Sequence, residues 1–348
     1  MTITKLAWRD LVPDTESYQE LFAQPELAKE HEFILSDTQP RLHYALEQVL
    51  SPWATAPFML LKAPEEAEYL TLLGDAVRQL KPEANAVFGG QYRIAGHDVT
   101  FEPAAQADGL FAAKGEVITA NWVEAEQLFG CLRQFNGELS LQPGLVHRAN
   151  GGVLIISLRT LLSQPLLWMR LKTIVHQQRF DWVGYDESRP LPVSVPSMPL
   201  SLTVVLTGDR ESLADFQEME PELAEQAVYS EYEDNTQIAD ADDMAQWCQW
   251  VMAVAERFAL PTPAADAWPG LIREAVRYTG DQETLPLCPL WIGKQLREVG
   301  VISGNGAFTG EQLTQMLAQR EWREGYLADR MQDEILLEQI LVETEGER

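Results

Sequence analysis

A run of branched apolar residues at positions 153–156 (VLII) places the strongest constraint on the fold of this chain. It follows the pair Gly151 and Gly152, and such an uninterrupted run is typical of a strand buried on both faces of a parallel sheet. Similar runs occur at 58–61 (FMLL) and 202–206 (LTVVL), with helical patterns between them. From about residue 240 the pattern is helical throughout. The sequence therefore predicts an α/β core with a parallel sheet flanked by helices, followed by an all-helical lid.

The residues after these strands lack the groups that an active nucleotide site needs. In nucleoside triphosphatases, a buried strand of this kind ends in two acids, which help to hold Mg²⁺ and to place the attacking water. Here Ser157 and Leu158 follow the strand. The junction after the first strand, residues 60–70 (LLKAPEEAEYL), contains no glycine whose backbone could wrap a phosphate. Both parts of a nucleotide site are therefore predicted to be lost.

Three separated motifs carry a resemblance to a known family. They are QLFG at 127–130, PGLVHRANGG at 143–152 and PLLWMRLK at 165–172, in that order. The chain resembles, from about residue 36 to residue 348, the ATPase-like half of bacterial Lon-like proteases of the LonB type. The resemblance implies an AAA-like fold, ATP binding and assembly into a ring that admits protein substrates. It also implies a proteolytic domain with a Ser–Lys dyad after the final ETEGER, and we expect that domain to lie outside these 348 residues.

The spacing of the family locates the degenerate nucleotide site in this chain. The resemblance places Glu68 where the family has its phosphate-binding lysine and Tyr69 where it has a hydroxyl, and it matches Asp209 to a polar residue after the fourth core strand. The predicted remnants of the site are Lys62, Pro64, Glu68, Tyr69, Ser157, Leu158 and Asp209. Without a phosphate nearby, a Gly-Asp turn is the better account of Asp209. We therefore predict that ATP binding is lost and that no other cofactor replaces it.

Charged residues near these positions have structural interpretations as well as functional ones. Glu65, Glu66 and Glu68 repel a triphosphate, and two of them suit the first turn of a helix, where the macrodipole favours acids. Arg159 is interpreted as a surface or interface cation. The segment 218–234, where the family has an arginine finger, contains no Arg or Lys. Arg273 or Arg277 could stand for a nucleotide-sensing arginine, but solvated helix cations are the preferred interpretation.

Composition excludes several classes of partner. The chain has 53 acidic and 26 basic side chains, a net charge of −27, which disfavours nucleic acid and anionic membranes. No apolar run reaches the roughly 18 residues of a membrane span. Three scattered cysteines without metal or redox spacing fit a reducing cytoplasm. The histidines lack the spacing of a helical metal pair, so no metal site is expected, and His147 is predicted to support the turn before the strand at 153.

The predicted organisation has four parts. They are an N-terminal arm at 1–35, an AAA-like domain at 36–237, a helical lid at 238–330 and a helix or linker toward the protease domain at 331–348. Within the AAA-like domain, 83–120 is treated as an insert that contains a β-hairpin, and 122–135 is predicted to be helical. The tail at 338–348 is expected to fray without its partner domain.

Two functional hypotheses remain open at this point. In the first, the chain is a non-hydrolysing AAA-like module of a serine endopeptidase, used for subunit assembly and substrate admission, with no catalytic residue of its own. In the second, it is a standalone, non-enzymatic adaptor or scaffold that binds a protein partner. The reading frame after Arg348 discriminates between them, because a continuing protease domain favours the first and a stop codon the second.

Overall fold

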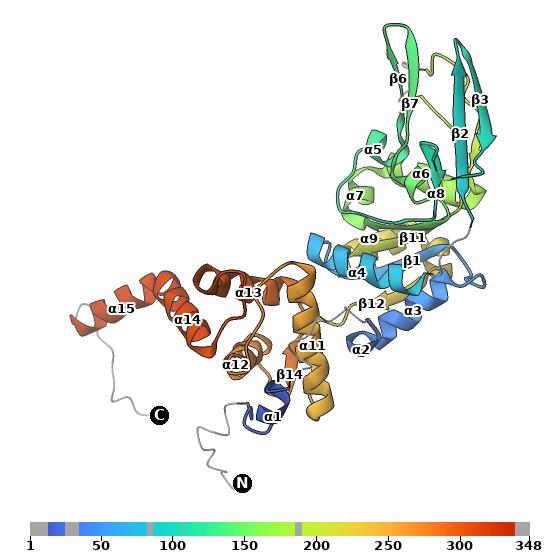
Figure 1. Ribbon diagram of the computed structural model, residues 1–348. Coiled ribbons are helices and arrows are strands. Elements are labelled where there is room, and N and C mark those ends of the chain that lie inside the picture. Colours follow the sequence, from blue (N-terminus) through green and yellow to red (C-terminus); the bar gives the residue numbers. More distant parts are fainter. Residues whose placement is uncertain (1–12, 25–34, 82–85, 107, 185–189, 338–348) are drawn as a thin grey trace. The chain divides into compact units, whose positions relative to one another are not determined.

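The chain forms two compact units (Figure 1). The computed structural model describes residues 13–24, 35–81, 86–106, 108–184 and 190–337. One unit, Phe33–Glu233, is the α/β unit, and the other, the helical unit, combines Met1–Glu32 with Asp234–Arg348. The tail at 338–348, which was expected to fray, lies outside the described residues.

A five-stranded parallel sheet forms the centre of the α/β unit. Its order is β12-β1-β11-β8-β5, and every neighbouring pair runs parallel. The strands are β1 (Phe58–Lys62), β5 (Val117–Ala120), β8 (Gly152–Ser157), β11 (Leu202–Gly208) and β12 (Val228–Glu231). All six residues of β8 are buried, as expected for a central strand covered on both faces. The predicted α/β fold with a parallel sheet is confirmed.

The register aligns the carboxyl ends of the three central strands. Leu154 of β8 is the partner of Val204 in β11, so the two apolar runs lie side by side, as their composition predicts. At the end of the sheet, Ser157 pairs with Thr207, and Gly208 pairs with Lys62 of β1. Loops that leave these strands therefore start within one residue of each other at the same edge.

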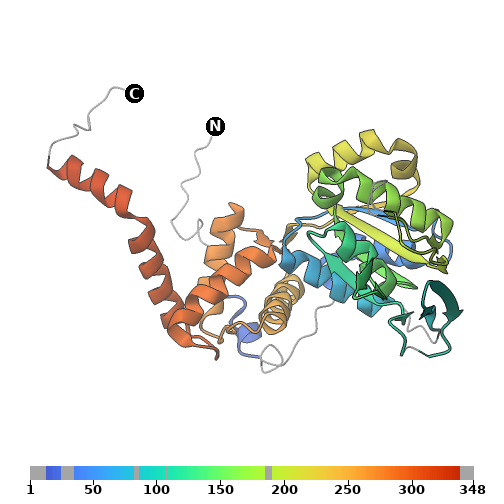
Figure 2. The same cartoon turned by 90° about the horizontal axis from the view of Figure 1, so that it is seen from above.

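Helices cover both faces of the sheet (Figure 2). One face packs Phe58, Leu60, Leu154 and other alternate strand residues against the three helices α7 to α9 in a single buried cluster. The helices of this unit are α2 (Leu35–Thr38), α3 (Pro40–Leu50), α4 (Ala67–Leu80), α5 (Ala125–Phe129), α6 (Leu145–Arg148), α7 (Leu158–Ser163), α8 (Pro165–Gln177), α9 (Arg210–Met219) and α10 (Pro221–Gln226). Of these, α3 packs on β12, and α4 packs on β5 and β8.

Two β-hairpins project from the α/β unit next to each other (Figure 1). The first pairs β2 (Phe88–Ala95) with β3 (Asp98–Pro103), as the sequence predicts, and β4 (Phe111–Ala113) joins the other side of β2. The second pairs β6 (Cys131–Phe135) with β7 (Glu138–Gln142).

Two sequence-based expectations for this part of the chain are wrong. The helix predicted for 122–135 is wrong, because α5 stops before Gly130, which has a φ of 72°, and the chain then forms β6. Asn136 and Gly137, both with positive φ, make the hairpin turn. In addition, β5 at the end of the presumed insert 83–120 belongs to the central sheet, where it pairs with β8.

In its described residues, the helical unit has five main helices and one small sheet. The helices are α11 (Ala241–Arg257), α12 (Trp268–Thr279), α13 (Pro289–Ser303), α14 (Gly310–Glu324) and α15 (Tyr326–Leu336). They confirm the predicted helical lid, except that β13 (Asn235–Gln237) pairs with β14 (Thr284–Pro286). The short α1 (Gln19–Phe22) joins this unit through Phe22, which stacks on Trp268 with 6.2 Å between ring centroids. No helix in the described part of the chain is long and apolar enough to cross a membrane.

Candidate functional site

The carboxyl edge of the parallel sheet is where a ligand site is expected in this type of fold. Ligands of open α/β sheets bind beyond the carboxyl ends of the strands, where the strand order reverses. In this sheet that place is beside β1, which has β12 on one side and β11 on the other. The loops after β1, β8 and β11 meet there, and they carry the predicted remnants of the nucleotide site.

The loop after β1 is short and fixed to its neighbours. It contains Ala63, Pro64, Glu65 and Glu66, and α4 begins at Ala67. The N–H of Ala63 donates a hydrogen bond to the carbonyl oxygen of Gly208 at 3.1 Å. Glu66 is the N-cap residue, but its side chain makes no capping hydrogen bond. The loop therefore lacks the wide, glycine-rich path that a phosphate-binding loop takes around its ligand.

The positions that the family spacing assigns to lysine and hydroxyl lie in the first turns of α4. Glu68 is a half-buried acid in the first turn, where it suits the helix dipole. Tyr69 is buried, and its ring meets that of Tyr232 edge-on with 5.1 Å between centroids. Tyr69 is therefore part of the packing between α4 and the chain just after β12.

Glu65 has a role that the sequence did not reveal. Its side chain is buried, and its Oε1 accepts hydrogen bonds from Ser157 Oγ at 2.6 Å and from the backbone N–H of Arg159 at 3.1 Å. The guanidinium Nε of Arg159 lies 3.1 Å from Oε2 of the same carboxylate. Glu65 therefore holds the loop after β8, and among the three acids only Glu68 lies in the first turn of α4.

Leu158 lies where active nucleoside triphosphatases have their second acid, as the sequence analysis predicts. It is fully buried at the start of α7. It also lies against the end of β11, because a Cβ added to Gly208 would come within 3.0 Å of Leu158 Cδ1. Hydrocarbon therefore occupies the gap between the ends of β8 and β11. An apolar surface of this kind does not favour the binding of a metal ion, because Mg²⁺ prefers oxygen ligands and retains several waters.

Lys62 and Asp209 are held by partners of their own. The Nζ of Lys62 donates to Glu231 Oε2 at 2.6 Å, across β1 and β12, and this bond is the largest cause that holds the pKa of Glu231 below its usual value. Asp209 is the N-cap of α9 and accepts from the backbone N–H of Ser212 at 2.7 Å. Hydrogen bonds from Ser212 lower the pKa of Asp209, and the charge of Arg159 acts in the same direction.

The structure thus brings some predicted residues together and separates others. Ser157 and Arg159 both contact the carboxylate of Glu65, and the charge of Arg159 also acts on Asp209. Lys62 instead pairs with Glu231 of β12, and Tyr69 packs against Tyr232. A signal for Glu65 was present in the sequence, since an acid after one core strand and an arginine after another are expected to meet when both strands end at one edge. That inference needs the strand order, which the sequence alone did not give.

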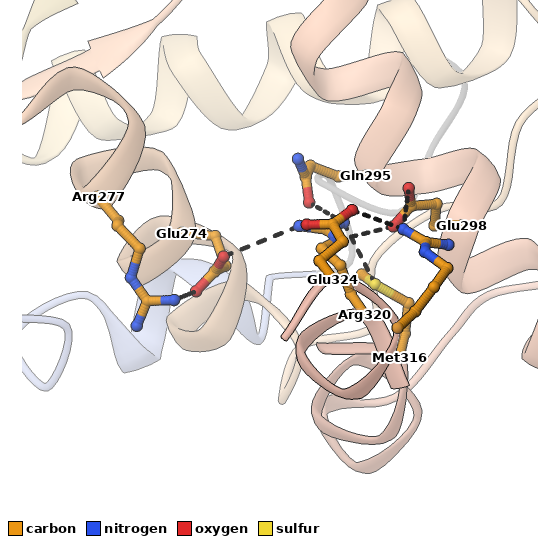
Figure 3. A network of polar contacts seen from close by, with 8 residues as sticks. Glu274, Arg277, Gln295, Glu298, Met316, Arg320 and Glu324 are labelled. Atoms are coloured by element: carbon orange, nitrogen blue, oxygen red, sulfur yellow. Dashed lines mark hydrogen bonds and ion pairs between the residues drawn. The ribbon is translucent and has the colours of Figure 1, made fainter. Parts of the chain in front are cut away.

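Arg277, one of the two arginines considered as a nucleotide sensor, belongs to a polar network inside the helical unit (Figure 3). Arg277 pairs with Glu274 at 2.9 Å along α12. Arg320 of α14 lies 4.0 Å from the same carboxylate and donates to Glu298 at 2.7 Å and to Gln295 at 2.6 Å. The network therefore links three helices of this unit, α12, α13 and α14. Arg273 is exposed on α12. No group of three metal-binding side chains occurs among the described residues.

Comparisons with known proteins agree with the fold and the motifs. Residues 114–227 match the family model described as "LonB-like, AAA domain". The chain is 66% identical over 348 residues to the protein of Escherichia coli (strain K12) named "Putative Lon protease homolog", covering 100% of this chain and 59% of that protein. It is 33% identical over 301 residues to a protein of the same name from Haemophilus influenzae (strain ATCC 51907 / DSM 11121 / KW20 / Rd), covering 84% of this chain and 50% of that protein.

Solved structures were also compared. A crystal structure of NtrX from Brucella abortus aligns with a TM-score of 0.45 and 12% identity, over 85% of this chain and 56% of that chain. A structure of the same protein in complex with ATP aligns with a TM-score of 0.44 and 13% identity, over 94% of this chain and 67% of that chain. From the family match and the two relatives, this chain belongs to the LonB-like family of Lon protease homologues.

Proposed function

We propose that this chain is a non-hydrolysing AAA module of a Lon-like serine endopeptidase in the cytoplasm. In this role it assembles subunits into a ring and admits polypeptide substrates to a proteolytic chamber. The chain spans 59% and 50% of the lengths of the two relatives, so the peptidase activity is proposed for the longer protein and not for these residues.

The position of Glu65 is the observation that supports the loss of nucleotide chemistry. Its carboxylate is buried at the edge of the sheet where a phosphate is expected, and it already occupies the hydroxyl of Ser157 and the cation of Arg159. Two like charges at about 4 Å repel each other by roughly 4 kcal/mol in a protein surface environment. A triphosphate would therefore have to displace Glu65 and break its bonds before it could bind.

Calorimetry with ATP and Mg²⁺ tests this proposal. We expect no heat of binding from the chain, because the loop after β1 has no glycine and Glu65 blocks the edge of the sheet. An active AAA ATPase, titrated under the same conditions, serves as the positive control. A dissociation constant near 1 μM, which corresponds to about 8 kcal/mol, would contradict the proposal because it requires an intact phosphate cradle.

Peptide hydrolysis by the longer protein separates this proposal from the adaptor hypothesis. A Lon-like peptidase with a nucleotide-independent AAA module should degrade an unfolded polypeptide at the same rate with and without ATP. Hydrolysis that stops when ATP is removed would contradict the proposal. A longer protein that forms complexes but cleaves nothing would instead support a non-enzymatic adaptor.

A further inference from the structure

The Glu65 carboxylate connects two loops that are not neighbours in the sheet. It extends from the loop after β1, whereas its partners Ser157 and Arg159 follow β8. Strand β11 lies between β1 and β8. The carboxylate therefore bridges two strands across the end of a third.

The groups that contact this carboxylate are of the types that bind free anions in other proteins. One hydroxyl, one backbone N–H and one guanidinium converge on it. Oxyanions such as phosphate and carboxylate are recognised by donors of these three types. Glu65 itself is buried, and an ionised carboxylate is stable in such a place only when it is paired and hydrogen-bonded. The donors are therefore arranged around a charge that the chain supplies itself.

We propose that Glu65 is a built-in anion that takes the place of a bound phosphate and holds the loops after β1 and β8 together. Removal of its side chain then exposes a site for a small oxyanion, formed by Ser157 and Arg159. The role of Glu65 is structural. It is independent of whether the longer protein is a peptidase.

The variant Glu65→Ala tests the bridge. We expect its melting temperature to fall by about 3 °C or more, because the buried hydroxyl of Ser157 and the backbone N–H of Arg159 lose their acceptor. The exposed guanidinium of Arg159 also loses its partner. Glu66→Ala is the matched control, since Glu66 is the next residue, is exposed and makes no capping bond through its side chain. The control should melt with the parent chain.

Chemical rescue tests the anion site. Acetate or inorganic phosphate at about ten times its dissociation constant should raise the melting temperature of Glu65→Ala by about 3 °C or more, relative to chloride at matched ionic strength. The parent chain should gain less than about 1 °C, because Glu65 occupies its site. The double variant Glu65→Ala/Arg159→Ala should lose the rescue, because it lacks the cation.

The outcomes decide the proposal separately from the one on function. The proposal is overturned if Glu65→Ala melts at the temperature of the parent chain. It is also overturned if acetate or phosphate raises the melting temperature of the parent chain as much as that of Glu65→Ala, or if the double variant is fully rescued. If Glu65→Ala does not fold, Glu65→Gln replaces it, and melting of Glu65→Gln at the parent temperature would show that the charge is not needed. ATP binding by the parent chain would contradict the proposed loss of nucleotide binding and leave the rescue result untouched.

Discussion

At the scale of single residues, His147 shows how a polar side chain from a family motif becomes part of a core. Its Nδ1 accepts a hydrogen bond from the backbone N–H of Gly144 at 3.0 Å, which confirms that it supports the turn before β8. The neutral ring must therefore carry its proton on Nε2. That nitrogen has no hydrogen-bond partner among the described residues, and the ring lies among Phe111, Phe180 and Trp182. The motif residue thus serves packing and turn geometry.

The burial of His147 predicts a loss of stability in acid. Burial, and to a smaller degree the nearby charge of Arg170, lower the pKa of His147 to about 3. Since the folded pKa is below the unfolded value near 6.5, the unfolded chain binds the proton first as the pH falls. This contribution to stability is complete above pH 6.5 and is lost between pH 6.5 and about 3. The loss approaches about 1.4 kcal/mol for each pH unit within this range.

Urea unfolding at pH 7.5 and 5.5 measures this effect. The parent chain should lose about 1 kcal/mol more free energy of unfolding than His147→Phe over this interval, because the variant has no proton to bind there. Comparison with the variant removes the contribution of the many carboxylates. His97→Gln, at the exposed turn between β2 and β3, is the control and should behave like the parent. An equal pH dependence of all three chains would show that His147 is not the group responsible.

At the scale of secondary-structure elements, the buried strands were predictable and the exposed hairpin was not. The runs that form β1, β8 and β11 are short and largely apolar. Such runs are typical of strands that are buried on both faces of a parallel sheet, which makes these strands predictable. In contrast, the apolar spacing of residues 125–135 fits a helix as well as a strand. Gly130 and the Asn136–Gly137 turn, all with positive φ, decide for the hairpin.

The same limit applies to the candidate site. The loss of glycine after β1 and of acids after β8 could be read from the sequence, because each is a local property. The bridge from Glu65 to Ser157 and Arg159 could not, since it depends on the order of three strands that are far apart in the chain. Long-range contacts of this kind follow from the fold and not from local spacing.

Ile155 provides a test of the central strand. It is completely buried in the middle of β8. Replacement by Asp should prevent folding of the α/β unit, because it places an unpaired charge in the core. Ile155→Val is the matched control and should cost only about 0.5–1.5 kcal/mol. Solubility and thermal melting followed by circular dichroism measure both. A soluble Ile155→Asp chain that melts like the parent would mean that this position is not in the core.

At the scale of the whole molecule, the helical unit is assembled from two separate parts of the chain. Residues near the start contribute α1, and residues after Asp234 contribute all of the main helices. Phe22 of α1 is buried and stacks on Trp268 of α12, whose ring in turn meets Trp247 of α11 edge-on. The α/β unit lies between these two parts in the sequence and has a core of its own. Each unit is therefore expected to respond separately to damage in its own core.

Phe22→Ala tests this separation. A buried Phe replaced by Ala costs about 3–5 kcal/mol, because apolar contact is lost and a cavity remains. Hydrogen exchange should therefore become faster in α11 and α12, which pack around Trp268, while β8 and β11 keep the exchange rates of the parent chain. Glu20→Ala, in the same short helix, should leave both units unchanged, because Glu20 is an exposed acid. If Phe22→Ala accelerates exchange equally in β8 and β11, the two units unfold as one, and the early segment belongs to a single cooperative structure.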